Sequence, residues 1–363
     1  MTTKGIMTVR RHQSVLHSTI QQSGFTLIEL MVGMVIASIV VAAAFSLLTT
    51  TSKAMRANEQ IVDTQQNARM AMELLAKDLK RAGFGNPGVP IGNCTSSIVP
   101  GDQNAVGVDA GPDSVQVLVP TARTIGPNRW TLKTKTTSAG VTQITLQPGA
   151  VADMVTSGLV ANSYISVGGA ATAMATAFDS AASTINVVIP APLWFQQEDQ
   201  VYLLQCIRYQ VVLAPDPGNL CLGHAPCLTR GVAGGAGPNA EAMIAEGIED
   251  LQLAYACDGC VTAINSGIPN RIIDDQNASN SFDQADFLSN VPWTVPPLTP
   301  DKIKLVQVAL VARQSKNDQG FGEGVAGVGS PTMTVTSDHP LPADSNHRRR
   351  VLVKTVETRN VGL

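Results

Sequence analysis

Hydrophobic residues form one unbroken run near the start of the chain. Residues 25–48 make up 24 positions with a single charged side chain, Glu29. As a helix this run would be about 36 Å long, which is enough to cross a bilayer. The pattern therefore predicts a membrane-spanning helix over about residues 25–48, with one carboxylate placed inside its apolar sequence.

Beyond this run the helical pattern continues as an amphipathic stripe. Positions on the stripe recur at spacings of four and three, and all but one are apolar: Ile61, Gln65, Ala68, Met72, Leu75, Leu79 and Ala82. Gly83 and Gly85 follow, and glycine commonly ends a helix. We expect one long helix over residues 25–83, whose second half packs on the protein's own globular domain.

From residue 84 the hydrophobic period changes from helical spacing to two. Alternating runs rich in β-branched residues, separated by turn residues, predict strands near 113–120, 130–136, 141–149, 163–169, 183–190, 199–213, 248–257, 302–314, 331–337 and 348–360. The expected fold class is α+β: a long helix, then a large, mainly antiparallel β-rich domain over residues 84–363. Loop-like stretches at 231–241 and 289–301 could divide it into two subdomains.

The first 24 residues have the composition of a targeting segment. They carry Lys4, Arg10 and Arg11 and no acidic residue. Because positive flanks stay on the cytoplasmic side, we expect the rest of the chain to lie across the membrane. A net charge of -3 and 4% aromatic residues give no support for a nucleic-acid partner.

Six cysteines follow: Cys94, Cys206, Cys221, Cys227, Cys257 and Cys260. The expected topology places them in an oxidising compartment, where disulfides persist. Six cysteines allow 15 connectivities. We favour the two short loops 221–227 and 257–260, which leaves Cys94 with Cys206. A zinc site with the nearby His224 is the alternative, but the spacings match no common zinc finger, so we expect no metal.

Two polar segments suggest weaker possibilities. Residues 274–286 place side-chain oxygens at intervals like those of a calcium loop, at Asp275, Asn277, Ser279, Asp283 and Asp286. However, Asn280 stands where the sharp-turn glycine belongs, so a solvated polar loop is favoured. Residues 348–350 are three arginines, interpreted as the exposed start of a strand. No catalytic motif is present in the sequence, and we expect neither an enzyme nor a cofactor.

The stretch "GFTLIEL", residues 24–30, resembles the N-terminal signature of type IV prepilins and of type II secretion pseudopilins. The resemblance implies that a prepilin peptidase cuts after Gly24 and methylates Phe25, so that residues 1–24 are a leader peptide. Two features depart from the family pattern. No Lys or Arg directly precedes Gly24, and no proline interrupts the apolar half of the helix.

The resemblance offers an explanation for the carboxylate of Glu29 in the apolar run. A carboxylate at membrane depth is costly and needs a partner, and the apolar run holds no Lys, Arg or His. Cleavage after Gly24 would create an amine on Phe25, one helical turn away or on a neighbouring subunit. We therefore expect Glu29 to set the register between subunits. The alternative is a carboxylate that reaches the lipid headgroups from the interface.

Three further segments indicate which family of prepilin-like proteins the chain resembles most. Residues 74–85, 245–258 and 347–360 are similar to PilW-type minor pilins. This implies an inner-membrane subunit with a periplasmic C-terminal domain, later incorporated into a type IV pilus. Its expected partners are other minor pilins and the major pilin, in a priming or tip complex that can include a PilY-type adhesin. Two alternatives remain: a J-type secretion pseudopilin, and an adhesin or ligand-binding module anchored by a pilin-like helix.

Overall fold

The computed structural model describes residues 25–85, 88–101, 111–138, 141–188, 196–232, 240–261, 267–289, 291–314 and 347–361. The chain separates into two compact units, Met1–Arg56 and Ala57–Leu363. Gly24 and the strand expected at 331–337 fall outside the described residues.

The long helix predicted from the sequence is present. Helix α1 spans Leu27–Arg81, 55 residues, and continues through Gly33. Gly83 follows it with φ 77°, a left-handed conformation that ends a helix with least strain when the residue is glycine. In the first unit every described side chain is exposed. In the second unit the helix buries the predicted stripe, including Ala68, Met72, Leu75 and Leu79.

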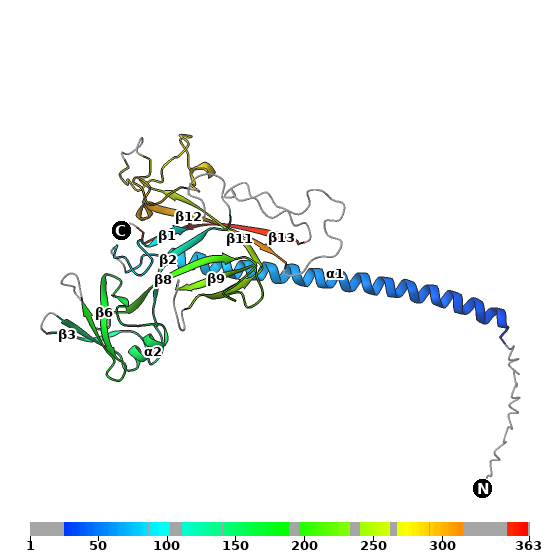
Figure 1. Ribbon diagram of the computed structural model, residues 1–363, viewed down its shortest axis with the longest axis horizontal. Coiled ribbons are helices and arrows are strands. Elements are labelled where there is room, and N and C mark those ends of the chain that lie inside the picture. Colours follow the sequence, from blue (N-terminus) through cyan, green and yellow to red (C-terminus); the bar gives the residue numbers. More distant parts are fainter. Residues whose placement is uncertain are drawn as a thin grey trace, which may run out of the picture. The chain divides into compact units, whose positions relative to one another are not determined.

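The larger sheet of the second unit has ten antiparallel strands (Figure 1). Eight of them follow the spatial order β1-β2-β8-β5-β6-β7-β4-β3, while β9 pairs with β8 and β10 with β9. Their bounds are β1 (Ile98–Gly101), β2 (Ser114–Thr121), β3 (Leu132–Ser138), β4 (Val141–Leu146), β5 (Tyr164–Val167), β6 (Ala171–Asp179), β7 (Thr184–Val188), β8 (Val201–Val212), β9 (Cys227–Val232) and β10 (Ala242–Glu246).

A second sheet of three antiparallel strands follows in the sequence. It has the order β11 (Ile248–Cys257), β12 (Ile303–Arg313) and β13 (Arg349–Glu357). Two short 3₁₀ turns, Gln284–Asp286 and Pro300–Lys302, lie between β11 and β12. All ten residues of β11 are buried. The fold class is therefore α+β, as the sequence predicts.

Among the described residues of the second unit, two large hydrophobic cores stand beside two small clusters. The larger core joins the stripe of α1 to side chains from both sheets, among them Val117, Tyr209, Leu253 and Leu310. The smaller core lies around β3–β7 and the short helix α2 (Ala150–Thr156), with Trp130 fully buried. Burial of the helix stripe ties the second half of α1 to both sheets.

Three disulfides cross-link the domain: Cys94–Cys206, Cys221–Cys227 and Cys257–Cys260. These are the pairs favoured from the sequence, and no described cysteine is free. They differ greatly in sequence separation, which is 112, 6 and 3 residues. Because a disulfide restricts the unfolded chain more when it closes a longer loop, their contributions to stability should differ in the same order.

Replacing each cysteine pair by serines tests this ranking. The chain-entropy relation predicts losses in unfolding free energy of about 4.8 kcal/mol for Cys94–Cys206, about 2.2 for Cys221–Cys227 and about 1.6 for Cys257–Cys260. Denaturant unfolding of the full chain in detergent measures all three. An equal loss for the shortest and the longest loop would contradict the ranking.

Candidate functional site

The start of α1 forms a capping box between Thr26 and Glu29. The Thr26 backbone N–H donates to Glu29 Oε2 at 3.0 Å, and the Thr26 hydroxyl donates to the same oxygen at 2.9 Å. The Glu29 N–H donates back to Thr26 Oγ1 at 3.3 Å. This reciprocal pair satisfies backbone donors that the first turn of a helix leaves open.

The capping box changes the interpretation of Glu29. Its carboxylate has hydrogen-bond donors before any cleavage creates an amine, so it is not an orphan in the uncut chain. The pattern Thr-x-x-Glu at residues 26–29 is a sequence signal for such a box, and the sequence-based interpretation of Glu29 did not include it. A role in register between subunits must therefore be separated experimentally from a role in starting the helix.

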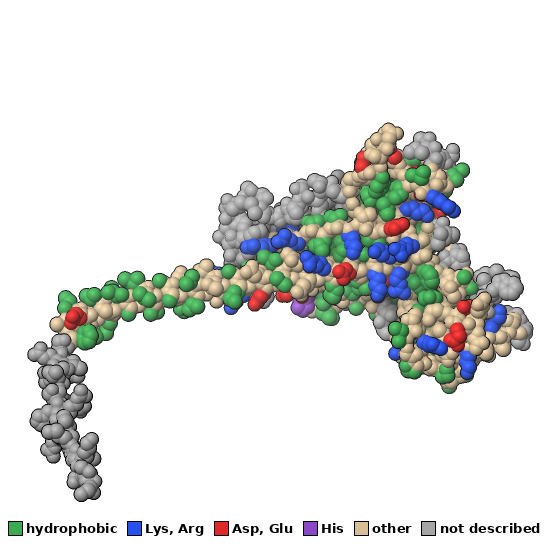
Figure 2. All heavy atoms as spheres, turned by 180° about the vertical axis from the view of Figure 1, so that it is seen from behind, with side chains coloured by type: hydrophobic (Ala, Val, Ile, Leu, Met, Phe, Trp, Pro, Cys, Tyr) green, Lys and Arg blue, Asp and Glu red, His purple; other side chains and the backbone are tan. Residues whose placement is uncertain are grey.

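The apolar half of α1 offers a large exposed hydrophobic surface (Figure 2). Side chains such as Phe25, Leu27 and Phe45 are 88%, 77% and 68% exposed. Among the described residues, α1 is the one helix long and apolar enough to cross a membrane. A soluble monomer rarely leaves so much apolar surface uncovered, so this surface fits membrane anchoring and packing against other helices.

Further along α1, Asp78 forms a buried polar cluster with Tyr209 of β8 and Arg230 of β9. Asp78 is 2% exposed. Its Oδ2 atom accepts hydrogen bonds from Tyr209 Oη at 2.6 Å, from Arg230 Nε at 2.9 Å and from Arg230 Nη2 at 2.7 Å. Arg230 Nε also lies 2.9 Å from Tyr209 Oη. The cluster joins the domain half of the helix to two neighbouring strands of the larger sheet.

Burial, and then the charge of Asp78, raise the pKa of Tyr209 above its ordinary value of 10.0. The phenol therefore stays protonated as a donor to the carboxylate. For Arg230, burial opposes the charged form, but Tyr209 and Asp78 outweigh it and raise the pKa of the guanidinium. The phenol and the guanidinium therefore both keep their protons well above neutral pH and remain donors to Asp78.

The raised pKa of Tyr209 predicts a loss of stability in alkali. The unfolded chain releases the phenol proton near pH 10 while the folded chain retains it, so the free energy of unfolding falls as the pH rises above about 10. Unfolding of the wild type should weaken more between neutral pH and strong alkali than unfolding of Tyr209→Phe. Tyr164→Phe is the matched control, and a wild-type slope identical to that of Tyr209→Phe would contradict the prediction.

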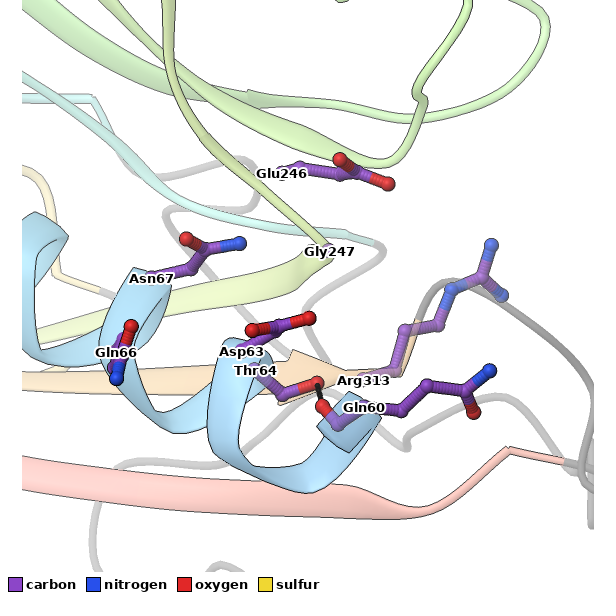
Figure 3. Close-up of a pocket in the computed structure, with 8 residues that line it drawn as sticks. All are labelled: Gln60, Asp63, Thr64, Gln66, Asn67, Glu246, Gly247 and Arg313. Atoms are coloured by element: carbon purple, nitrogen blue, oxygen red, sulfur yellow. Dashed lines mark hydrogen bonds between the residues drawn. The ribbon is translucent and has the colours of Figure 1, made fainter. Parts of the chain in front are cut away.

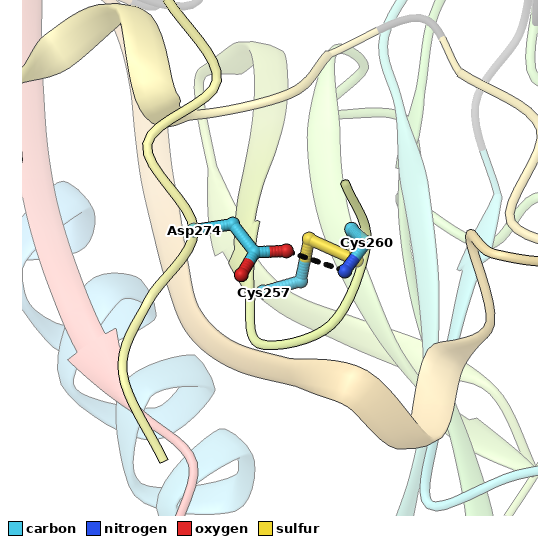
Figure 4. Close-up of side chains that lie close together, drawn as sticks. All are labelled: Cys257, Cys260 and Asp274. Atoms are coloured by element: carbon cyan, nitrogen blue, oxygen red, sulfur yellow. Dashed lines mark hydrogen bonds between the residues drawn. A yellow bond between two sulfur atoms is a disulfide. The ribbon is translucent and has the colours of Figure 1, made fainter. Parts of the chain in front are cut away.

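One group of side chains has the composition of a metal site (Figure 4). Sulfur atoms of Cys257 and Cys260 and an oxygen of Asp274 lie within 4.8 Å of one another, all in buried residues. The two sulfurs are joined in a disulfide. Asp274 Oδ2 accepts the N–H groups of Cys260 at 2.5 Å and Val261 at 2.9 Å. The carboxylate therefore fixes the turn closed by the disulfide, and no thiolate is available to a metal.

The loop at 275–286 uses its carboxylates to hold its own backbone. Asp275 accepts N–H groups from Asn277, Ser279 and Asn280. The amide of Ala285, followed by the side chain of Asn277, lowers the pKa of Asp283 below its ordinary value of 3.8. Asp286 departs from the expected solvated loop because it is fully buried and closes a capping box with Asp283.

The arginines at 348–350 are not uniformly exposed, which corrects the sequence-based interpretation. The side chain of Arg349 is fully buried and pairs with Glu249 of β11, with Nε 2.6 Å from Oε2. Arg313 approaches the same carboxylate at 3.6 Å. Arg348 and Arg350 are exposed as expected. Alternation along β13 turns the middle arginine inward, where it needs an acidic partner.

A polar cleft of about 210 Å³ lies beside residues 60–67 of α1, at the start of the second unit (Figure 3). Asp63 and Asn67 of the helix face Glu246, the last residue of β10, and Gly247, which connects β10 to β11. Arg313 lies at one end of the cleft. Thr64 turns its hydroxyl to the Gln60 carbonyl oxygen at 2.7 Å. The described residues of the cleft supply carboxylates, amides and one guanidinium, which suit the binding of a polar group.

Comparison with known proteins matches two parts of the chain. A family model described as type IV pilus-assembly protein W matches residues 216–360. A model of the prokaryotic N-terminal methylation motif matches residues 20–45, which include Gly24, Phe25 and Glu29. No curated protein and no solved structure matches the chain.

Proposed function

Because this chain belongs to the type IV pilus minor pilins of the PilW family, we propose that prepilin peptidase cuts it after Gly24 and that its apolar helix then carries it into the filament. The observation that carries this proposal is the methylation motif over residues 20–45 joined to a helix whose apolar half is exposed on all sides. Phe25, at the start of that helix, is the residue that would be methylated.

Before assembly, the protein waits in the inner membrane with its N-terminus in the cytoplasm and its disulfide-bonded domain in the periplasm. Three positive charges before the apolar run and three disulfides after it support this orientation. In the filament, α1 packs against the helices of other minor pilins and of the major pilin. The subunit acts in a priming or tip complex, with a PilY-type adhesin as a further partner.

Two other functions compete with this one. A J-type secretion pseudopilin would carry the same motif, but the match of residues 216–360 to the pilus-assembly family favours the pilus. An adhesin anchored by a pilin-like helix would need its domain for binding and not for assembly. The pilins are structural proteins, and nothing in the described residues suggests a catalytic role.

Deleting the gene distinguishes these functions. Loss of surface pili and of twitching motility, restored by the wild-type gene, supports a role in assembly. Complementation with Gly24→Val, in which a branched side chain should block cleavage, is expected to leave the deletion phenotype unchanged. Normal pili with lost surface adhesion would overturn the assembly role in favour of an anchored adhesin.

A further inference from the structure

A second cavity, of about 610 Å³, lies in the second unit near the end of α1. Thr358 is one of its lining residues, and nearby Asn360 lies against the turn after the helix. A side-chain carbon on Gly83 would stand 2.7 Å from the Asn360 carbonyl oxygen. The part of α1 in the second unit therefore has the cleft beside Gln60 near its start and this cavity near its end. Its volume is in the range of pockets that hold small ligands or a few peptide residues.

Two cations line this cavity without acidic partners. Neither Arg271 nor Lys304 makes an ion pair with any described residue, and Lys304 Nζ donates to the Val361 carbonyl oxygen at 3.0 Å. Pro269, Ile273 and Leu305 add apolar surface. Charge and apolar surface together suit an acidic group attached to an apolar chain.

The position of Arg271 is held by a buried carboxylate. Asp258 is 1% exposed and lines the cavity, but both of its oxygens are occupied. Oδ1 accepts the N–H of Asn270 and Oδ2 accepts the N–H of Arg271, each at 2.7 Å. Arg271 has φ 71°, a left-handed conformation rare for a residue with a side chain. Strain of this kind persists where the surroundings enforce it, and it is often found at binding sites.

Further hydrogen bonds hold backbone segments that adjoin the cavity residues in sequence. Lys302, two residues before Lys304, donates from Nζ to the carbonyl oxygens of Gly259, Gly267 and Pro297 at 2.8–2.9 Å. The Cys257–Cys260 disulfide closes the turn that holds Asp258. The loop that carries Arg271 is thus held by these contacts, and Lys304 is held by its place on strand β12. A site organised in advance loses little entropy when its ligand binds.

The end of strand β13 forms the remaining part of the cavity wall. In the described part of the smaller sheet, β13 pairs with β12 on one side and with no strand on the other. Glu357, its last residue, and Thr358 both line the cavity. An extended segment added along this edge of the described sheet would pass the cavity and could place one side chain inside it. None of the described residues that line the cavity is aromatic, which disfavours a sugar.

We propose that this cavity binds a glutamate or aspartate side chain of an extended segment from a partner protein, with Arg271 and Lys304 as the recognising cations. Arg271 supplies the forked donor geometry that matches a carboxylate, and Lys304 adds a second positive charge. Glu357, an exposed residue that also lines the cavity, opposes the acidic ligand. The inference goes beyond the filament role and does not depend on it, since binding is measured on the purified protein.

Fluorescence anisotropy on the full chain in detergent tests the proposal. The probe is a labelled, amidated pentapeptide with the sequence TVEVT, and its matched control replaces the glutamate by glutamine. The acidic peptide should bind at least about tenfold more tightly. Arg271→Gln and Lys304→Gln should each remove most of that preference, and Glu357→Gln should tighten binding of the acidic peptide. Lys354→Gln, an exposed cation on β13 outside the cavity, should change affinity less than about twofold.

Opposite effects at Glu357 and Arg271 cannot come from a general loss of folding, and the thermal midpoint of each variant checks folding directly. If one variant fails to fold, the peptide pair and the remaining variants still decide. Equal binding of the two peptides, no binding of the acidic peptide, or unchanged affinity in Arg271→Gln and Lys304→Gln would overturn the proposal. Glucuronate competing as well as the peptide would overturn the assignment to a protein segment.

Discussion

Replacing Asp78 by alanine is expected to lower the free energy of unfolding of the second unit by about 3–5 kcal/mol. Three donors from Tyr209 and Arg230 converge on one oxygen of this buried carboxylate. Removing it leaves the Arg230 charge partly buried without its partner, and it also removes the polar link between α1 and strands β8 and β9. Thermal unfolding of the full chain in detergent, followed by circular dichroism, measures the loss.

Two variants make this test specific. Asp63→Ala removes an exposed carboxylate from the same helix and should change stability by less than about 0.5 kcal/mol. Asp78→Asn retains an oxygen acceptor but not the charge, so its effect should lie between the other two. A midpoint for Asp78→Ala within the error of Asp63→Ala would show that the cluster does not hold the helix to the sheet.

Variants at Glu29 and Thr26 are expected to separate charge from helix capping in filament assembly. Glu29→Gln preserves the capping box, because glutamine can replace glutamate at this position, but it removes the charge. Thr26→Ala retains the charge and removes the cap. If Glu29 sets register through its charge, Glu29→Gln should be nearly absent from sheared filaments, while Thr26→Ala should be incorporated nearly as well as wild type.

Immunoblots of sheared filaments and of membranes provide the measurement. Each variant is first checked for removal of residues 1–24, since a processing defect would also abolish incorporation. The reverse pattern, with Glu29→Gln incorporated and Thr26→Ala lost, would assign the residue to helix capping. Wild-type incorporation of Glu29→Gln, Glu29→Ala and Thr26→Ala alike would contradict both roles.

Elements with a clear hydrophobic period could be predicted from the sequence. The stripe from Ala68 to Ala82 located the buried face of α1, and β12 was expected at 302–314 and lies at Ile303–Arg313. Strand β6 was missed because its sequence, "ATAMATAFD", is mostly alanine and threonine and lacks the bulky alternation used to identify strands. Helix α2, with seven residues, is too short to show a helical period.

The buried charges could not be predicted, because their partners are distant in sequence. Asp78 meets Tyr209 across 131 residues, and Arg349 meets Glu249 across 100. On α1, Asp78 has the sequence pattern of a polar surface residue. Its position between Leu75 and Leu79 of the apolar stripe nevertheless indicated that it lies close to the buried face of the helix. The cavity near the end of α1 could not be predicted for a different reason: Asp258 fixes Arg271 across only 13 residues, but through backbone groups that no sequence pattern reveals.

The most direct test of the central claim is mass spectrometry of the N-terminus of this protein recovered from sheared pili. We predict a chain that begins at an N-methylated Phe25, present in amounts well below those of the major pilin. A chain that retains residues 1–24, or one found in membranes and never in the filament fraction, would contradict its identification as a processed filament subunit.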